Sequence, residues 1–127
     1  MPTMTSRVAL LIAALALFVA VAAGAFGAHT LAKQVGTERL AVWQTAVEYH
    51  AWHGLAIFGI GLLMRTSPAL HGLAVAAGLF LAGIVMFSGS LYLLAVTGVT
   101  GLGFVTPVGG VAFLAGWAML AWAVLRA

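Results

Sequence analysis

The sequence predicts an all-α integral membrane protein, a single bundle of four transmembrane helices formed by residues 1–127. Three observations support this fold class. Of the 127 residues, 65% are hydrophobic and only 6% are charged, whereas soluble domains carry roughly a quarter charged residues. The apolar residues fall into four long runs, near residues 8–28, 43–64, 69–96 and 107–125. Each run reaches the roughly 20 residues that a helix needs to cross the hydrocarbon core of a bilayer.

The composition also excludes several functional classes. The net charge of +3 comes from five basic side chains, and these do not form the basic patch that nucleic-acid binding requires. We therefore expect no nucleic-acid partner. The chain has no cysteine, which excludes disulfides, thiolate metal sites and cysteine nucleophiles.

The first run could be mistaken for a secretory signal. Arg7 precedes an apolar stretch that ends in small residues at Ala25-Phe26-Gly27-Ala28, which is the order found in a signal peptide. The apolar stretch is longer than a usual signal core, however, and the chain that follows is itself apolar. We therefore expect residues 8–28 to form an uncleaved span.

The second helix is predicted to begin after a polar connection. Gly36-Thr37-Glu38 is typical of a break, an N-cap and an acidic first turn. A helix from Glu38 to Met64 is about 40 Å long, which exceeds the roughly 30 Å of the hydrocarbon core. Its first turns, which include Trp43, are therefore expected among the lipid headgroups, where tryptophan is enriched.

Two proline signals mark the last two helices. Ser67 as N-cap and Pro68 as first helical residue predict the start of the third helix, which continues past an interruption at Ser88-Gly89-Ser90. Thr106 and Pro107 repeat the signal and open the fourth helix.

Four spans place both termini on the same side of the membrane. That side would hold Arg7, Arg65 and Arg126, and the other side would hold Lys33 and Arg39. Because cytoplasmic ends carry the excess of Lys and Arg, the count predicts a multi-pass protein of the plasma (inner) membrane with cytoplasmic termini.

Small residues recur at the spacing of helix interfaces. They lie at every fourth position of the first and fourth runs, at Ala16, Ala20, Gly24 and Ala28 and at Ala112 and Gly116. Such stripes let helix backbones approach closely in lipid, which predicts a tight bundle rather than a wide pore.

The polar residues within the spans are the candidates for function. They are His29, Glu48, Tyr49, His50, His53, His71, Ser88, Ser90 and Tyr92. An ionisable group at membrane depth is costly, so Glu48 suggests a proton or cation role. The structural alternative is that Glu48 pairs with Lys33, with His29 or with backbone near the membrane surface.

The angular spacing of the second helix separates these groups. At about 100° per residue, Glu48 shares a face with Gln44, while His50 and His53 fall together on nearly the opposite face. The two histidines could share one metal ion, with His29 as a third ligand. Zinc sites usually have three or four protein ligands, so this metal or haem hypothesis rests on an incomplete set of ligands.

The serines of the third helix do not suggest hydrolysis. No G-x-S-x-G pattern or neighbouring base accompanies Ser88 and Ser90. Both are expected to bond to backbone carbonyls or to a neighbouring helix, with Gly89 giving a close crossing and Tyr92 lying in the interface belt. The sequence therefore predicts neither an enzyme nor a bound cofactor.

Four stretches carry a family resemblance: GAFGAH (24–29), WQTAVEYHAWHGLAIFG (43–59), FSGSLYLLA (87–95) and FVTPVGGVAFLAGW (104–117). Together they resemble the family catalogued as domain of unknown function 423, which is grouped with the eukaryotic transmembrane protein 256. The resemblance implies a small plasma-membrane protein of about four spans without an established activity. The motif positions it matches are His29, Glu48, Tyr49, His53, Ser88, Ser90, Tyr92, Thr106 and Pro107.

These features favour a membrane protein that acts by binding, as an accessory or assembly component. Its expected partners are membrane lipid and either another membrane protein or a second copy of the chain. One alternative is a small transporter or channel that uses Glu48. A second alternative is a metal or haem protein that uses His29, His50 and His53.

Overall fold

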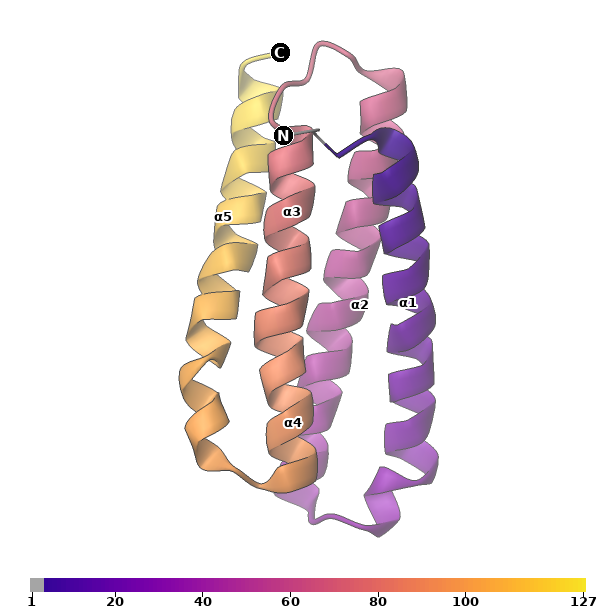
Figure 1. Cartoon of the computed structure of the whole chain (residues 1–127), viewed down its shortest axis with the longest axis vertical. Coiled ribbons are helices and arrows are strands. Elements are labelled where there is room, and N and C mark those ends of the chain that lie inside the picture. The colour runs from indigo at the N-terminus through magenta and orange to yellow at the C-terminus, as the bar shows by residue number, and fades with distance from the viewer. Residues whose placement is uncertain (1–3) are drawn as a thin grey trace.

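The computed structural model describes residues 4–127 and contains four long helices packed side by side (Figure 1). The first two are α1 (Ser6–His29) and α2 (Thr37–Thr66). The third is continuous and consists of α3 (Leu73–Gly83), one π-helical segment (Ile84–Ser88) and α4 (Gly89–Thr97). The fourth is α5 (Thr106–Leu125). Within the described residues there is no strand.

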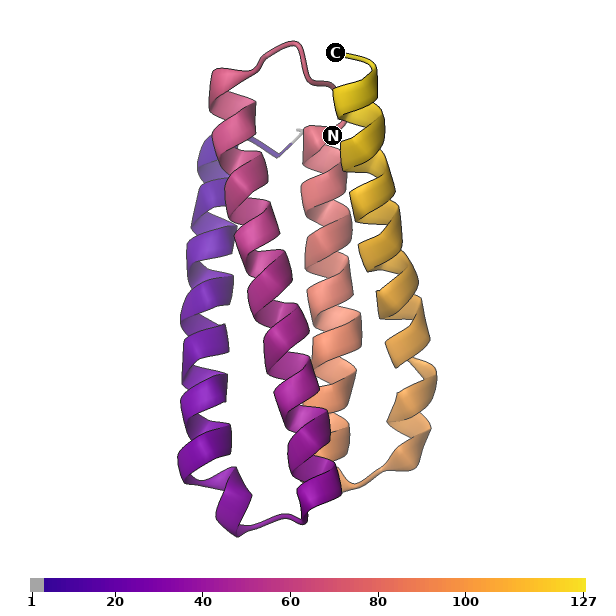
Figure 2. The same cartoon turned by 180° about the vertical axis from the view of Figure 1, so that it is seen from behind.

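The helices alternate in direction along the bundle. The two ends of the chain and the α2–α3 connection lie at one end of the bundle (Figures 1 and 2). The connections that contain the short 3-10 helices Leu31–Lys33 and Thr100–Phe104 lie at the other end. This is the arrangement expected of four spans, with both termini on the same side.

Three of the four helices are long and apolar enough to cross a membrane: Ser6–Lys33, Leu73–Thr97 and Thr100–Leu125. The remaining helix, α2, runs the length of the bundle with 30 residues. Its lower hydropathy reflects polar side chains that include Glu48, His50 and His53. The surface of the bundle is covered by apolar side chains, as in Phe18 and Leu114, which suits lipid as the surrounding solvent.

The helix ends agree with the sequence signals in part. Gly36 is the N-cap of α2, one residue before the predicted cap. The predicted start of the third helix at Pro68 is wrong, because the helix begins at Leu73. Gly72 precedes it with φ +89°, a left-handed conformation that a continuous helix cannot contain. Pro68 therefore lies in the connection, not in the first helical turn.

The interior is held by close helix crossings at glycines. A Cβ added to Gly109 on α5 would lie 2.3 Å from the backbone nitrogen of Phe87 in the π-helical segment. Gly89, predicted to make this crossing, has only one atom within 4 Å of such a Cβ, at 4.0 Å. The close crossing therefore belongs to Gly109, because the π-helical turn brings the backbone at Phe87 rather than Gly89 against α5.

The α1–α2 contact also uses small residues, although not the full predicted stripe. The buried residues of α1 are Ala9, Ala13, Ala20 and Gly27. Ala28, the last member of the predicted stripe, is exposed. Gly27 is required because a Cβ there would lie 2.6 Å from the Trp43 ring on α2. The result is a tight bundle in the described residues, as the small-residue pattern predicts.

Two aromatic residues assigned to the headgroup belt pack between helices. Trp43 is 8% exposed and its indole nitrogen donates to the Ala23 carbonyl on α1 at 2.8 Å. The Tyr92 ring is half-buried and tilted against Trp43, with ring centroids 4.5 Å apart. Both side chains therefore connect helices, and the cause is long-range packing that local hydropathy does not report.

Candidate functional site

The polar segment of α2 divides into an inner and an outer face. His50 and His53 are each 4% exposed, whereas Gln44 and Glu48 are exposed. This separation follows from the 100° step of the helix, as the sequence predicts. The inner and outer faces therefore have to be considered as two distinct sites.

On the inner face, His50 connects α2 to α4. Its Nδ1 lies 2.8 Å from the hydroxyl of Tyr92. Either the imidazole or the tyrosine hydroxyl can be the donor in this bond. The contact ties α2 to α4.

His53 occupies a similar position between α2 and α5. Its Nδ1 donates to the Tyr49 carbonyl at 2.7 Å, and its Nε2 accepts from the indole N–H of Trp117 at 3.1 Å. Its ring stacks on Phe113 with centroids 3.6 Å apart. Since a carbonyl only accepts and an indole N–H only donates, these two bonds describe a neutral imidazole whose lone pair is already in use.

The structure does not bring the proposed metal ligands together. His29 is exposed at the end of α1, while His50 and His53 point into different interhelical contacts. Among residues 4–127, no group of three or more His, Cys, Asp or Glu side chains is placed to hold a metal ion. The three-ligand set of His29, His50 and His53 is therefore not assembled in the described residues.

The serines of the third helix bond as the sequence predicts. The buried Ser88 hydroxyl donates to the Ala46 carbonyl on α2 at 2.8 Å. Ser90 lies 2.9 Å from the Phe87 carbonyl and 2.7 Å from the Thr106 hydroxyl. Thr106 therefore links the third helix to the start of α5, where Pro107 occupies the first turn. Both hydroxyls serve helix association.

The fully buried polar side-chain atoms of the bundle have partners. In the described part of the chain, no buried side-chain nitrogen or oxygen atom lacks a hydrogen-bond partner. Such satisfaction is expected where water is absent.

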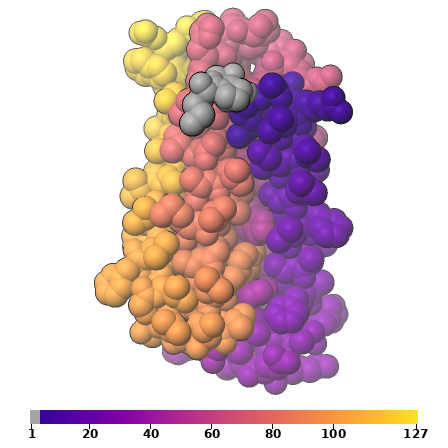
Figure 3. Space-filling model, in the orientation of Figure 1, coloured from indigo at the N-terminus to yellow at the C-terminus, as the bar shows by residue number. Residues whose placement is uncertain are grey.

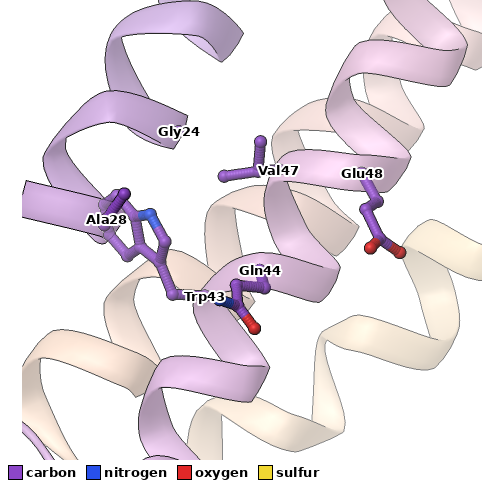
Figure 4. A pocket seen from close by; sticks show the side chains of 7 residues that line it. Gly24, Ala28, Trp43, Gln44, Val47 and Glu48 are labelled. Atoms are coloured by element: carbon purple, nitrogen blue, oxygen red, sulfur yellow. The ribbon is translucent and has the colours of Figure 1, made fainter. Parts of the chain in front are cut away.

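The outer face is different, because Glu48 points out of the bundle. Within residues 4–127 its carboxylate has neither a hydrogen-bond nor an ion-pair partner, so the predicted pairing with Lys33 or His29 does not form. In Figure 4, Glu48 points away from α1, whereas Val47 points toward it. A carboxylate in this position lies on the outside of the single bundle and not along its interior.

The depth of Glu48 follows from its neighbour. A Cβ on Gly24 of α1 would lie 3.6 Å from the Val47 side chain, so the two residues are at the same height. Gly24 precedes the end of α1 at His29 by five residues, or about 7 Å of helix. Glu48 therefore lies about 7 Å along the bundle from the end of α1, which is about the length of one and a half helical turns.

Two hollows flank this outer face. A groove of about 440 Å³ between α1 and α2 is lined by Gly24, Gly27, Ala28, Trp43, Gln44, Val47 and Glu48 (Figure 4). A second, largely apolar groove of about 540 Å³ lies between α2 and α5 and includes Tyr49, Trp52, His53 and Trp117. The first groove is the one that combines open space with a carboxylate and an amide.

Trp117 takes part in the site but was not among the candidates predicted from the sequence. It bonds to His53 across 64 positions of sequence. Nothing local identifies it as the partner, although its presence in the fourth family-like stretch singled out its neighbourhood. Gln44 was noted for sharing a face with Glu48, and the structure makes that pair the main exposed polar feature of the spans.

Comparisons with known proteins agree with a membrane location. Residues 23–110 match the family described as Protein of unknown function (DUF423). The chain is 47% identical over 124 residues to the UPF0382 inner membrane protein YgdD of Escherichia coli (strain K12), covering 97% of this chain and 93% of that protein. It is 41% identical over 120 residues to the UPF0382 membrane protein YwdK of Bacillus subtilis (strain 168), covering 94% and 98%. No solved structure matches the chain.

Proposed function

Because the chain belongs to the DUF423 family of membrane proteins of unknown function, we propose its role from its surface: a non-enzymatic component that binds other transmembrane segments sideways, in the plane of the bilayer. The observation that carries this proposal is the exposed Glu48, which lies about 7 Å along the bundle from the end of α1 and has no partner in the described residues. A carboxyl group exposed to lipid is costly, and a neighbouring helix can supply the missing hydrogen bonds.

The satisfied interior supports a binding role. Every buried polar side-chain atom in the described residues has a partner, and the histidines bond to aromatic residues of α4 and α5. The groups that would carry a reaction, a resident cofactor or an ion path are thereby engaged in holding the bundle together. The proposed partners are therefore membrane protein and membrane lipid, with no nucleic acid and no bound cofactor.

The experiment that tests lateral binding compares two leucines. Leu55 on the outer face of α2 is 57% exposed and Leu15 on α1 is 58% exposed. They lie at similar depth, because Gly54 contacts Ala16 and Leu17. A photoreactive side chain placed at each position in native membranes should give a protein adduct from position 55 and lipid adducts from position 15. Lipid adducts alone from both positions would contradict the proposal.

The orientation of the bundle forms part of the proposal. Arg7, Arg65 and Arg126 lie at the end of the bundle that holds both termini, and Lys33 and Arg39 lie at the other. This excess favours cytoplasmic termini. A reporter that is active only in the cytoplasm should function when fused after Ala127, and a reporter that is active only outside should not. The opposite result would invert the orientation.

A further inference from the structure

The outward face of α2 has the spacing of a helix–helix seam. Its residues follow one another at intervals of three or four, and we call them the outer stripe: Ala41, Gln44, Glu48, Trp52, Leu55, Gly59, Leu62 and Thr66. All are exposed except Gly59, which is half-buried. A Cβ on Gly59 would meet nothing within 4 Å, so this glycine is not needed for packing inside the bundle. Intervals of three and four residues place these side chains on one face of the helix, where a second helix can pack along its length.

The other lipid-facing surfaces have a different composition. The exposed side chains in the middle of α1 and α5 are apolar, as in Leu15 and Phe18 on α1 and Val111 and Leu114 on α5, and none carries a carboxyl or an amide group. Lipid is a sufficient neighbour for such surfaces. Figure 2 views the bundle from the side on which α2 lies in front. Figure 3 shows the opposite side, on which the surface is formed mainly by α1, the third helix and α5.

The polar pair on the outer stripe is complementary to itself. A two-fold axis along the membrane normal keeps two copies inserted in the same direction and places each residue at the depth of its own counterpart. The Gln44 amide supplies two N–H donors, and the Glu48 carboxyl, one turn along, accepts. Glu48 of each copy then lies at the depth of Glu48 of the other, and the donor for the carboxyl is the Gln44 amide across the axis, one turn away.

The structure also provides room for these long side chains. The groove of about 440 Å³ lies beside Gln44 and Glu48 at the same depth, with Gly24 and Ala28 on its α1 wall (Figure 4). A second copy could place its own glutamine and glutamate against this wall of small residues. Gly59, about four turns further along α2 than Gln44, would allow the two backbones to approach closely.

From this geometry we infer that the outer stripe of α2 is the interface of a two-fold symmetric dimer of this chain. The inference rests on the proposed lateral binding and names its occupant. The paired Gln44 and Glu48 side chains satisfy one another across the axis, so no charged group from a different protein is required. The predicted contact depends on hydrogen-bonding capacity at position 48 and not on negative charge.

The absence of cysteine gives a direct test, because each introduced thiol is the only one in the chain. In native membranes, Leu55→Cys should form a disulfide-linked dimer on mild oxidation. The matched control Leu15→Cys, at equal exposure and similar depth, should stay monomeric. Equal dimer yields from both positions would show random collision and would overturn the inference.

The chemistry of the contact is tested in the Leu55→Cys background. Glu48→Leu combined with Gln44→Leu should weaken dimerisation by at least about tenfold, since hydrogen bonds from both copies are lost. Glu48→Gln should keep dimerisation within about threefold, because a carboxamide still accepts and donates. Loss in Glu48→Gln equal to that in the double leucine variant would instead indicate a charged partner and overturn the self-paired interface. Fluorescence of the folded bundle in detergent would establish that each variant folds.

The two levels of the proposal fail differently. If Leu55→Cys gives no dimer while a photoreactive group at position 55 captures another protein, the dimer is wrong and lateral binding stands. If position 55 captures lipid alone and no dimer forms, both are wrong.

Discussion

The two faces of α2 both carry polar side chains, but those of one face are buried between helices and those of the other are exposed. On the inner face, His50 and His53 use their ring nitrogens to hold Tyr92 and Trp117 on neighbouring helices. On the outer face, Gln44 and Glu48 are exposed to the surroundings of the bundle. The inner residues match the features that sequence motifs associate with catalysis or metal binding, yet their bonding capacity is used in packing. The outer residues form no complete motif, yet their hydrogen-bonding groups have no partners in the described residues.

This difference shows where a search for function should start in a small membrane bundle. A polar side chain that faces inward can be satisfied by backbone carbonyls and by residues of adjacent helices, as Ser88 is by Ala46. A polar side chain that faces lipid has no such hydrogen-bond partners. Partner availability, rather than residue type, therefore separates the structural from the functional polar groups.

The largest expected effect contrasts an inner with an outer glycine. Gly109→Ala would place a Cβ 2.3 Å from the backbone nitrogen of Phe87, which only a separation of the helices can relieve. We expect a loss of more than about 2 kcal/mol in the free energy of unfolding. The Cβ added by Gly59→Ala has no neighbour within 4 Å in the single chain, so this variant should change the free energy of unfolding by less than about 0.5 kcal/mol. Unfolding in detergent at monomeric concentrations measures both.

Similar losses for the two glycine variants would mean that the outer stripe is packed within the single chain, and the contrast between the faces would fail. The same pair sharpens the dimer inference. Under dimeric conditions Gly59→Ala should weaken association, because its new methyl group would lie in the seam.

An intermediate effect is expected for the hydrogen bond between His50 and Tyr92. Tyr92→Phe leaves Nδ1 of a buried imidazole without its partner at 2.8 Å, which should cost about 1 kcal/mol. The control is Tyr49→Phe. Tyr49 is half-buried like Tyr92, but its hydroxyl has no partner within residues 4–127. This control variant should cost less than about 0.3 kcal/mol.

A double-mutant cycle isolates this inner bond. Combining Tyr92→Phe with His50→Leu should give a loss smaller than the sum of the single losses, since both variants remove one interaction. Additive losses would show that the two residues do not interact, and the description of the inner face would need revision.

Much of the architecture could be predicted from the sequence because it depends on composition and on the helical step. Long apolar runs in a chain with few charges predicted the helices, and the 100° step predicted that His50 and Glu48 face opposite ways. Ser88 and Ser90 bond to carbonyls and to a neighbouring helix, as their position in a span predicted.

What could not be predicted depends on contacts between distant residues. The contacts of Trp43 with Ala23 on α1 and of its ring with Tyr92 on α4 could not be predicted, because they join residues far apart in the sequence. The pairing of His53 with Trp117 spans two helices that no local pattern aligns. Gly109 and Gly89 look equivalent in sequence, and only the register of α5 against the π-helical segment distinguishes them.

The smallest expected effect concerns a polar residue of α2 at the edge of the bundle. Arg39 donates through Nε to the Ala95 carbonyl at 2.7 Å and through Nη2 to the Val96 carbonyl, where α4 is about to end. These carbonyls are the ones that a helix end leaves without intrahelical partners. Arg39 thus has hydrogen-bond partners within the chain, as His50 and His53 do and as Glu48 does not.

Arg39→Lys keeps the charge but loses the fork that reaches two carbonyls. We expect the last turn of α4 to open more often, which should raise hydrogen exchange at the Gly98 amide by about threefold while exchange in the centre of α5 stays unchanged. Arg65→Lys, at the opposite end of α2, is the control and should leave both unchanged. A uniform rise in exchange across all helices would mean that Arg39 contributes to the stability of the whole bundle. The stability would then depend on Arg39, at the edge of the bundle, as much as on the inner face of α2.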